Sequence, residues 1–408
     1  MRPESTAPAR ARSLHPSDIR GLARLGFDAA VGVTHLVEAM HHTIASRAGI
    51  VGAEPAGRTR GLAGLVYGTV RGSTRLVGRG LDAVLGAVTP RIATVPSTPE
   101  REAVVAVLNG LWGDHLAATH NPLAIPMTLR VEGEPLDLDA KALAARLPRA
   151  TGKLLVLVHG LCMNDQQWTR QGHNHGRALA RDLGYTPVWL HYNSGRHVSE
   201  NGREFAEQLE RLVAAWPVPV EDLTILAHSM GGLVTRSACH HAEGSGQHWR
   251  AALRRIVFFG TPHHGAPLER GGQQLDMLFA ISPYVAPFAR LGKARSAGIT
   301  DLRFGNLQDA DWKGRDRHAQ QRDDRAPLPL PAGVAVYLVA ATLAERAGVQ
   351  DRLVGDGLVP LASALGEHAD PRHALVVPNA HMHVVRSANH WDLLERPAVY
   401  AQLRAWLG

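Results

Sequence analysis

The chain has 408 residues, of which 45% are hydrophobic and 20% charged, a composition typical of folded globular proteins that excludes a disordered chain. Its formal net charge is +7, but the arginines are scattered and aromatic residues make up only 5%, so we expect no nucleic-acid partner. Two cysteines, Cys162 and Cys239, cannot build a disulfide framework, and a reducing, cytoplasmic location is the simpler expectation.

The N-terminal region predicts helices rather than sheet. Residues 1–18 are rich in Pro, Ser, Ala and Arg and lack the apolar core of a signal peptide, which predicts a disordered tail. Residues 19–125 contain a repeat in two copies, which predicts two similar helices with glycines at close helix contacts. The matched pairs are Gly21/Gly61, Leu22/Leu62, Leu25/Leu65, Gly32/Gly72, Leu36/Leu76 and Val37/Val77.

Two roles are open for these helices. They could form a soluble cap over the rest of the chain, or their apolar faces and neighbouring arginines could lie at a membrane interface. No stretch is long and apolar enough to predict a transmembrane helix.

Residues 126–408 alternate short apolar runs with helical patterns. This alternation predicts a mostly parallel central sheet with helices on both faces, an α/β fold. We expect strands at 127–131, 154–158, 187–191, 223–227, 256–259, 334–340 and 374–377. We expect helices at 201–216, 231–241 and 393–407, and a cap or lid insertion at about 263–331.

A candidate nucleophile lies between a predicted strand and a predicted helix, in Ala227-His228-Ser229-Met230-Gly231. Small residues two positions before and after Ser229 permit the sharp turn of a nucleophile elbow. The alternative is a serine that only caps the helix. A serine nucleophile also needs oxyanion donors, and we expect these from the backbone N–H groups of Met230 and Leu161. The side chain of His159, two residues before Leu161, is expected to be structural.

The expected order of a hydrolase triad is serine, acid, histidine. Asp356 lies between two glycines after a predicted strand and is the candidate acid, with a simple Asx turn as the alternative. Two histidines compete for the role of base. His390 directly precedes the last predicted helix and is preferred over His383.

Histidine is abundant, with 23 residues, which makes a metal site an alternative reading of these side chains. Pairs such as His173 and His175, or His263 and His264, lack the spacing of an HExxH or paired-cysteine site. We therefore expect neither a metal nor a cofactor.

Residues from about 150 to 408 resemble bacterial lipases and esterases related to the PGAP-type inositol-deacylase group. The likeness lies in the segments LVHGLCMND (157–165), HYNSGRHVSENG (191–202), LAHSMGGLV (226–234), FFGTPHHGAP (258–267), VGDGLVP (354–360) and NHWDLLERPAVY (389–400). The resemblance implies an α/β-hydrolase fold, with Ser229, Asp356 and His390 as the triad and Leu161 and Met230 at the oxyanion hole. It does not carry the inositol-deacylase activity to this chain.

The predicted function is hydrolysis of carboxylic esters with apolar acyl chains, on a small ester or lipid substrate. An apolar run in the insertion includes Phe279 and Phe288, which we expect to contact the acyl chain unless the run forms static core. Acyl transfer by the same triad and a non-catalytic lipid-binding scaffold are the alternatives. The sequence leaves the oligomeric state open.

Overall fold

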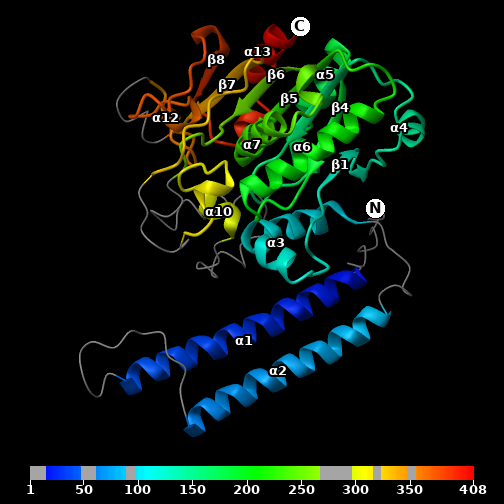
Figure 1. The fold of residues 1–408 in the computed structure, drawn as a ribbon. Helices are drawn as coiled ribbons and strands as arrows, with labels where there is room; N and C mark the ends of the chain where they lie inside the picture. The colour runs from blue at the N-terminus through cyan, green and yellow to red at the C-terminus, as the bar shows by residue number, and fades with distance from the viewer. Residues whose placement is uncertain (1–14, 47–60, 89–96, 267–295, 316–322, 347–354) are drawn as a thin grey trace, which may run out of the picture. The chain divides into compact units, whose positions relative to one another are not determined.

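The computed structural model describes the chain except for residues 1–14, 47–60, 89–96, 267–295, 316–322 and 347–354 (Figure 1). It divides into two compact units. The first comprises Met1–Thr98 and Ala118–Leu123, and the second comprises Pro99–Ala117 and Ala124–Gly408. Helix α3 (Pro99–Ala118) therefore belongs almost wholly to the second unit, although the expected boundary lay near residue 125.

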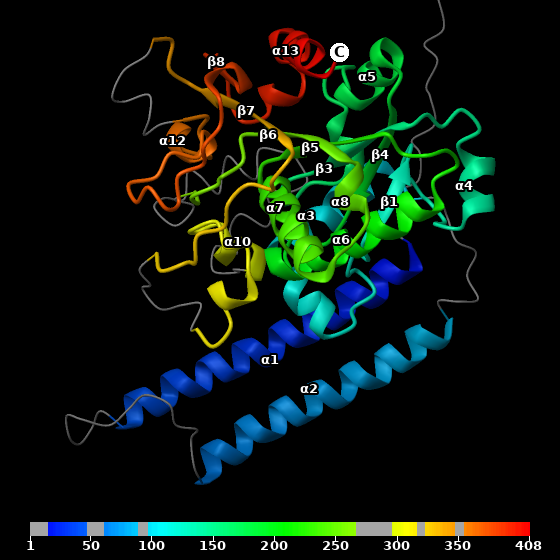
Figure 2. The same cartoon turned by 45° about the horizontal axis from the view of Figure 1, so that its top comes forward.

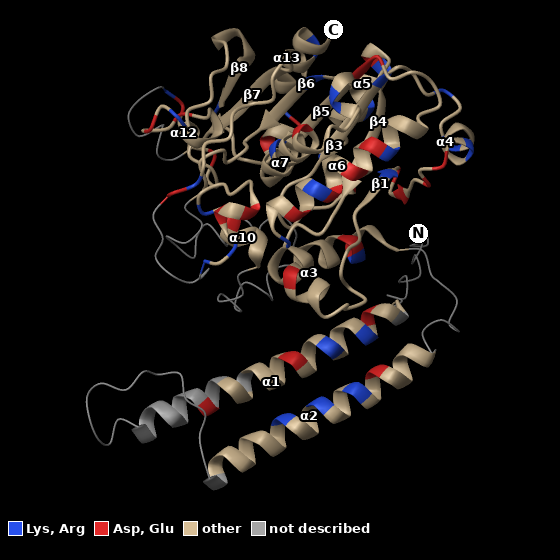
Figure 3. Cartoon of the chain, viewed as in Figure 1, with Lys and Arg blue, Asp and Glu red and all other residues tan. Residues whose placement is uncertain are grey.

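The first unit is a pair of long helices, α1 (Pro16–Ser46) and α2 (Gly61–Val88), which confirms the helical prediction for this region. Arg20 Nε contacts Asp82 Oδ1 at 2.7 Å, and Arg24 binds the same carboxylate. Further along, Arg71 of α2 pairs with Glu38 of α1. The start of α1 thus faces the end of α2, so the helices run antiparallel, with charged side chains on both (Figure 3).

The repeated glycines Gly32 and Gly72 do not have the contact role that the sequence suggested, whereas a Cβ atom at Gly21 would lie 2.4 Å from Leu123 Cγ. A Cβ atom added at Gly32 or Gly72 would meet no described atom within 4 Å. A close approach between the two helices is at Gly78 instead, where a Cβ atom would lie 3.0 Å from Phe27 Cγ. The antiparallel orientation of the helices explains this, because equivalent positions of the two repeat copies then do not lie opposite each other.

The second unit is built on an eight-stranded sheet in the order β2-β1-β4-β3-β5-β6-β7-β8. Strand β1 is antiparallel to its neighbours β2 and β4, and all other pairs are parallel. The strands are β1 (Thr128–Val131), β2 (Glu134–Pro135), β3 (Lys153–Val158), β4 (Thr186–His191), β5 (Asp222–His228), β6 (Leu253–Phe259), β7 (Ala335–Thr342) and β8 (Met382–Arg386).

Helices cover both faces of this sheet. The main helices are α4 (Ala140–Arg146), α5 (His175–Leu183), α6 (Val198–Ala215), α7 (Met230–Ser245), α8 (Trp249–Ala252), α10 (Ala297–Asp301), α12 (Leu361–Ala364) and α13 (Pro397–Leu407). Helices α6 and α7 pack side by side (Figure 2). They share one apolar core with α3, whereas α5 and α13 share a separate core on the opposite face.

Neighbouring strand residues alternate between these two cores. Val156 and Val158 of β3 lie in the core under α6 and α7, whereas Leu155 and Leu157 lie in the core under α5 and α13. Burial on both faces explains why the strands read as continuous apolar runs rather than as alternating patterns.

Two expected elements differ from the structure. Residues 374–377 do not form the last strand, because Val376 is 93% exposed and Pro378 follows; the strand is β8, Met382–Arg386. The predicted helix at 393–407 is divided into a 3-10 turn at Asp392–Leu394 and α13. Proline at position 397 starts a new helix because it lacks the N–H that would continue the preceding turn.

The strand order, the antiparallel β1, and the strand β5 that runs directly into α7 through Ser229 identify the α/β-hydrolase fold. The parallel strands β3 and β5 to β8 end at the same edge of the sheet, and the loops that follow them carry the site described below. Among the described residues, no helix is long and apolar enough to cross a membrane.

Candidate active site

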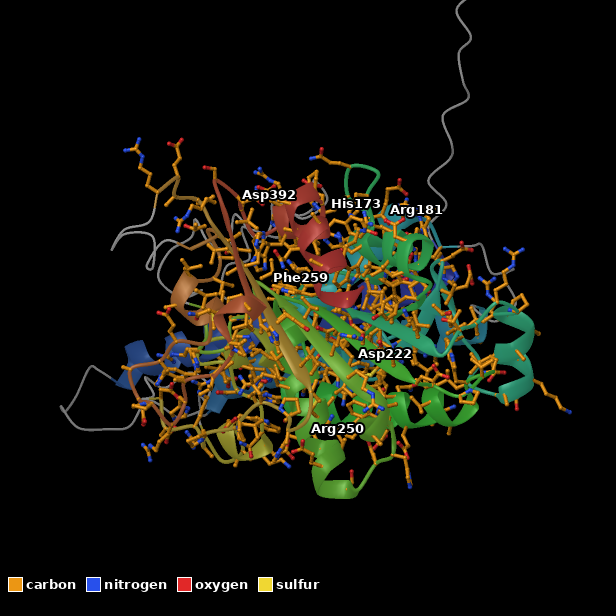
Figure 4. All side chains as sticks on the ribbon, turned by 90° about the horizontal axis from the view of Figure 1, so that it is seen from above. His173, Arg181, Asp222, Arg250, Phe259 and Asp392 are labelled. Carbon is orange, nitrogen blue, oxygen red and sulfur yellow. The ribbon has the colours of Figure 1, made fainter. Side chains whose placement is uncertain are left out.

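Ser229 occupies a strained turn between β5 and α7. Its backbone angles, φ 54° and ψ −128°, lie where residues other than glycine are rare. Its N–H donates to the carbonyl of Phe259 at 2.8 Å. Phe259 is the buried last residue of β6 (Figure 4). A Cβ atom at Gly231 would lie only 2.5 Å from the carbonyl oxygen of His159, so the turn requires glycine there. These features match a nucleophile elbow, and a serine side chain at this point makes no cap hydrogen bond.

The loop after β3 lies beside Ser229. A Cβ atom at Gly160 would lie 2.9 Å from Ser229 Cβ, which shows how closely this loop approaches the serine. Neither Leu161 nor Met230 donates a backbone hydrogen bond to another described residue. Both amides therefore lack an acceptor among the described residues.

The side chain of His159 holds this loop. Its Nδ1 atom is 2.9 Å from the carbonyl oxygen of Gly160, and its ring stacks on Tyr192 at 4.3 Å. The Tyr192 hydroxyl donates to the His159 carbonyl at 2.8 Å. Complete burial, reinforced by His191, lowers the pKa of His159 to about 3, so the ring is neutral. Its contacts are those of a structural residue.

Asp356 is buried, and both of its carboxylate oxygens are hydrogen-bonded to the protein. Oδ1 accepts the N–H groups of Leu358 at 3.0 Å and Val359 at 2.8 Å. Oδ2 lies 2.6 Å from His390 Nδ1. Gly355 and Gly357 both have positive φ, 54° and 94°, which bends the loop back so that these amides reach the carboxylate.

His390 is oriented by Asp356 at two points, because its own N–H also donates to the Asp356 carbonyl at 3.2 Å. With Nδ1 donating to the carboxylate, Nε2 keeps its lone pair. Nε2 is buried and has no hydrogen-bond partner among the described residues. A buried imidazole in this state is equipped to accept a proton.

His383, the competing histidine, lies within β8, where it is in register with Val339 of β7. It is half-buried, and this burial lowers the pKa of its ring. The structure thus brings Asp356 to His390, whereas Phe279 and Phe288 lie outside the described residues.

Two residues of the site were not singled out from the sequence. Gly260 follows β6, and a Cβ atom there would lie 3.0 Å from His390 Nδ1 and 3.1 Å from Asp356 Oδ2. A side chain at this position would therefore separate the Asp356 carboxylate from the His390 ring. The signal was available, since Gly260 opens the GTPHHG segment, but its contact partners are more than ninety residues away along the chain.

The second such residue is His228, which precedes Ser229. Its ring is fully buried 4.6 Å from the ring of His390, and its Nε2 atom is 3.3 Å from the His390 carbonyl oxygen. Burial and the neighbouring His390 lower the pKa of His228 well below the usual range, so it packs against His390 as a neutral ring. Within the described part of the chain, no cluster of histidine, cysteine and acidic side chains could hold a metal ion.

A family described as a domain of unknown function (DUF7379) matches residues 130–291. No curated protein matches the chain. Among solved structures, the mature lipase BlEst2 of Bacillus licheniformis is 17% identical, with a TM-score of 0.42, over 69% of this chain and 98% of that one.

Two further structures show similar levels of likeness. Lipase B of Aspergillus fumigatus is 12% identical, with a TM-score of 0.39, over 95% of this chain and 84% of the other. EstA of Clostridium botulinum is 12% identical, with a TM-score of 0.39, over 63% of this chain and 87% of the other. What the site can do therefore rests on its own geometry: a strained serine, a carboxylate-oriented histidine and free amides at one edge of the sheet.

Proposed function

We propose that the protein is a serine hydrolase that cleaves carboxylic esters with apolar acyl chains. The observation that carries this proposal is the buried His390–Asp356 pair, 2.6 Å between Nδ1 and Oδ2, at the edge of the sheet where Ser229 forms its elbow. A carboxylate, an imidazole and a serine in this chain order are the elements of a hydrolase triad.

In the proposed reaction, Ser229 Oγ attacks the ester carbonyl carbon while His390 Nε2 takes the hydroxyl proton. The oxyanion accepts hydrogen bonds from the amides of Leu161 and Met230. Collapse of this intermediate expels the alkoxide, which leaves as the alcohol with the proton from His390. Water then attacks the acyl-enzyme by the same route, releasing the acid and restoring Ser229. Asp356 keeps the imidazole in the required tautomer throughout.

The first test is labelling with a fluorophosphonate, together with a series of nitrophenyl esters of increasing acyl length. We expect stoichiometric labelling at Ser229, located by peptide mass spectrometry, and hydrolysis of at least one ester. Added alcohols identify acyl transfer, since a transferase would form new esters in preference to free acid. A folded protein that neither takes up the label nor cleaves any ester of the series would contradict the proposal.

The apolar insertion should set the preference for acyl length. We propose that residues 263–331 form a cap or lid and that Phe279 and Phe288 contact the acyl chain, as their apolar neighbourhood in the sequence indicates. Replacing both by alanine is expected to lower the rate on long-chain esters relative to short-chain esters, because apolar contact with the distal chain is lost. The ratio of kcat/KM for the two esters measures this. An unchanged ratio would assign the segment to core packing.

We further propose that the first unit binds peripherally to membrane surfaces, without spanning the bilayer. Large apolar side chains of α2 are exposed, including Leu65 at 66% and Leu76 at 73%. At 3.6 residues per turn they share one side of the helix with Val77 and Val84, and the exposed Arg75 and Arg79 lie along one border of that side. An apolar stripe bordered by arginine is typical of interfacial helices.

Vesicle sedimentation in the full-length protein tests this role. The double variant Leu65→Gln/Leu76→Gln is expected to bind vesicles with anionic lipid more weakly than the parent, because apolar area is removed from the stripe. The matched control Leu343→Gln/Val376→Gln removes exposed apolar side chains of the second unit, outside the stripe, and should bind as the parent does. Binding of the parent should also fall with added salt. Equal sedimentation of both double variants would remove the membrane role.

The two cysteines of the chain, Cys162 and Cys239, are both buried and unpaired. Burial raises the pKa of each thiol to about 12, so neither forms a thiolate easily. These features support the proposed cytoplasmic location, where thiols stay reduced.

A further inference from the structure

Leu161 lies in a turn that has little support from its own backbone. The hydrogen bond that closes the turn, from the N–H of Met163 to the carbonyl of Gly160, is long at 3.4 Å. Cys162, the residue after Leu161, has φ 59°, a left-handed conformation that is unfavourable for residues with a Cβ atom. A turn of this kind needs contacts from other parts of the chain to keep its shape.

The segment that follows β4 supplies these contacts on both sides of Leu161. The Tyr192 hydroxyl donates to the carbonyl of His159, and Ser194 Oγ accepts the N–H of Cys162 at 3.1 Å. Ser194 is buried, and its side chain makes no other hydrogen bond among the described residues. Its hydroxyl therefore has one direct contact to lose, which is the one that holds the Cys162 amide.

Close backbone packing holds both partners of this hydrogen bond. A Cβ atom at Gly195 would lie 2.0 Å from a carbonyl oxygen of α3, and one at Gly298 of α10 would lie 2.1 Å from the Ser194 carbonyl oxygen. The Gly298 N–H also donates to the carbonyl of Gly195 at 3.0 Å. In addition, a Cβ atom at Gly110 of α3 would lie 2.2 Å from Cys162 Sγ. Ser194 and Cys162 are thus packed tightly against neighbouring elements.

We propose that Ser194 is a positioning residue of the oxyanion hole. By holding the Cys162 N–H it fixes the turn, and the turn fixes the direction of the Leu161 N–H. This inference rests on the proposed function, in which the amides of Leu161 and Met230 bind the oxyanion. An oxyanion donor stabilises the transition state most when it is oriented before the charge develops. The Met230 amide is oriented by the start of α7, whereas the Leu161 amide lies in a turn and depends on an anchor from outside it.

Loss of this anchor should affect the transition state more than substrate binding. Ser194→Ala leaves the buried Cys162 N–H without its acceptor, so the turn is expected to relax. Removing an oxyanion donor outright costs about 100- to 1,000-fold in kcat, and a donor that is only misdirected costs less. We therefore expect Ser194→Ala to lower kcat by roughly 10-fold with KM little changed, because the amides bind the oxyanion more strongly than the ester carbonyl.

The matched control is Ser237→Ala, which removes the hydroxyl of another buried serine. Ser237 Oγ donates to the carbonyl of Leu307 at 2.7 Å and makes no hydrogen bond to the turn. This variant should keep the kcat of the parent even if its Tm falls. Fluorophosphonate titration normalises both variants, because the end point counts folded sites and the rate reports the oxyanion hole, which the phosphonyl oxygen occupies. Ser194→Ala should reach the end point of the parent about 10-fold more slowly.

Equal kcat per labelled site in Ser194→Ala and Ser237→Ala would overturn the proposal. A lower end point in Ser194→Ala without a change in kcat per labelled site would also overturn it, since the residue would then serve folding alone. A parent protein that takes up no label would remove the proposed hydrolase and this inference with it, so the two failures are distinguishable.

The labelled parent protein gives a second test, which stays decisive if Ser194→Ala fails to fold. In a crystal structure of the fluorophosphonate adduct, we expect the phosphonyl oxygen within hydrogen-bond reach of the Leu161 amide while the Cys162 N–H still donates to Ser194. An adduct in which the Leu161 amide points elsewhere, or in which the Cys162 N–H has left Ser194, would show that Ser194 does not position the oxyanion hole.

Discussion

Replacing Ser229 by alanine is expected to lower kcat for ester hydrolysis by about 10,000-fold or more, because triad members act as a unit. The fold should persist, since the hydroxyl makes no cap hydrogen bond and alanine meets the same backbone strain as serine. Steady-state kinetics on the best nitrophenyl ester measure the loss, and circular dichroism with Tm measures the fold.

The matched control for this variant is Ser245→Ala, the same substitution in the last turn of α7, where the serine is exposed. It should retain the activity of the parent. Near-normal turnover by a folded Ser229→Ala protein would remove Ser229 from the mechanism and would leave the strained turn without a catalytic reason.

Replacing His390 by alanine is expected to be nearly as damaging, because Ser229 would lose the base that takes its proton. His383→Ala should change kcat/KM little, since that ring lies within β8 while Asp356 contacts His390. The comparison of kcat/KM between the two variants measures the difference. His390 is buried and His383 is half-buried, so Tm values should be recorded for each variant to separate lost packing from lost chemistry.

If His383→Ala were the inactive variant and His390→Ala retained turnover, the assignment of the base would be wrong. If both variants lost kcat/KM in proportion to a fall in Tm, the loss would instead indicate a structural effect. Loss in His390→Ala with a folded protein, alongside an active His383→Ala, is the pattern that supports the proposed base.

Much of the sheet could be predicted because each parallel strand is buried on both faces and therefore appears as an apolar run. The runs that predicted β3, β5, β6 and β7 are of this kind. The last strand was misplaced because β8 carries half-buried polar residues, whereas residues 374–377 looked more apolar than their exposure allows. Local composition does not reveal which of two short segments pairs with the edge strand of the sheet.

The candidate site residues could be proposed from the sequence, because the turn at Ser229 and the loop at Asp356 each have glycines at characteristic positions nearby. Contacts between segments that are distant along the chain could not be predicted in this way. Gly260 beneath the His390–Asp356 pair and His228 against the His390 carbonyl become apparent only when the strand ends meet. The same holds for the antiparallel direction of α1 and α2, which no periodicity within either helix encodes.

In the loop that carries Asp356, the number of residues is more constrained than the identity of their side chains. The amides that fix the Asp356 carboxylate belong to the main chain of Leu358 and Val359, and other apolar residues would supply the same N–H groups. Proline there would delete a donor, and one inserted or deleted residue would shift both. A related chain could thus lose its likeness in this loop and keep a working acid, provided that the spacing between Asp356 and its two donors is preserved.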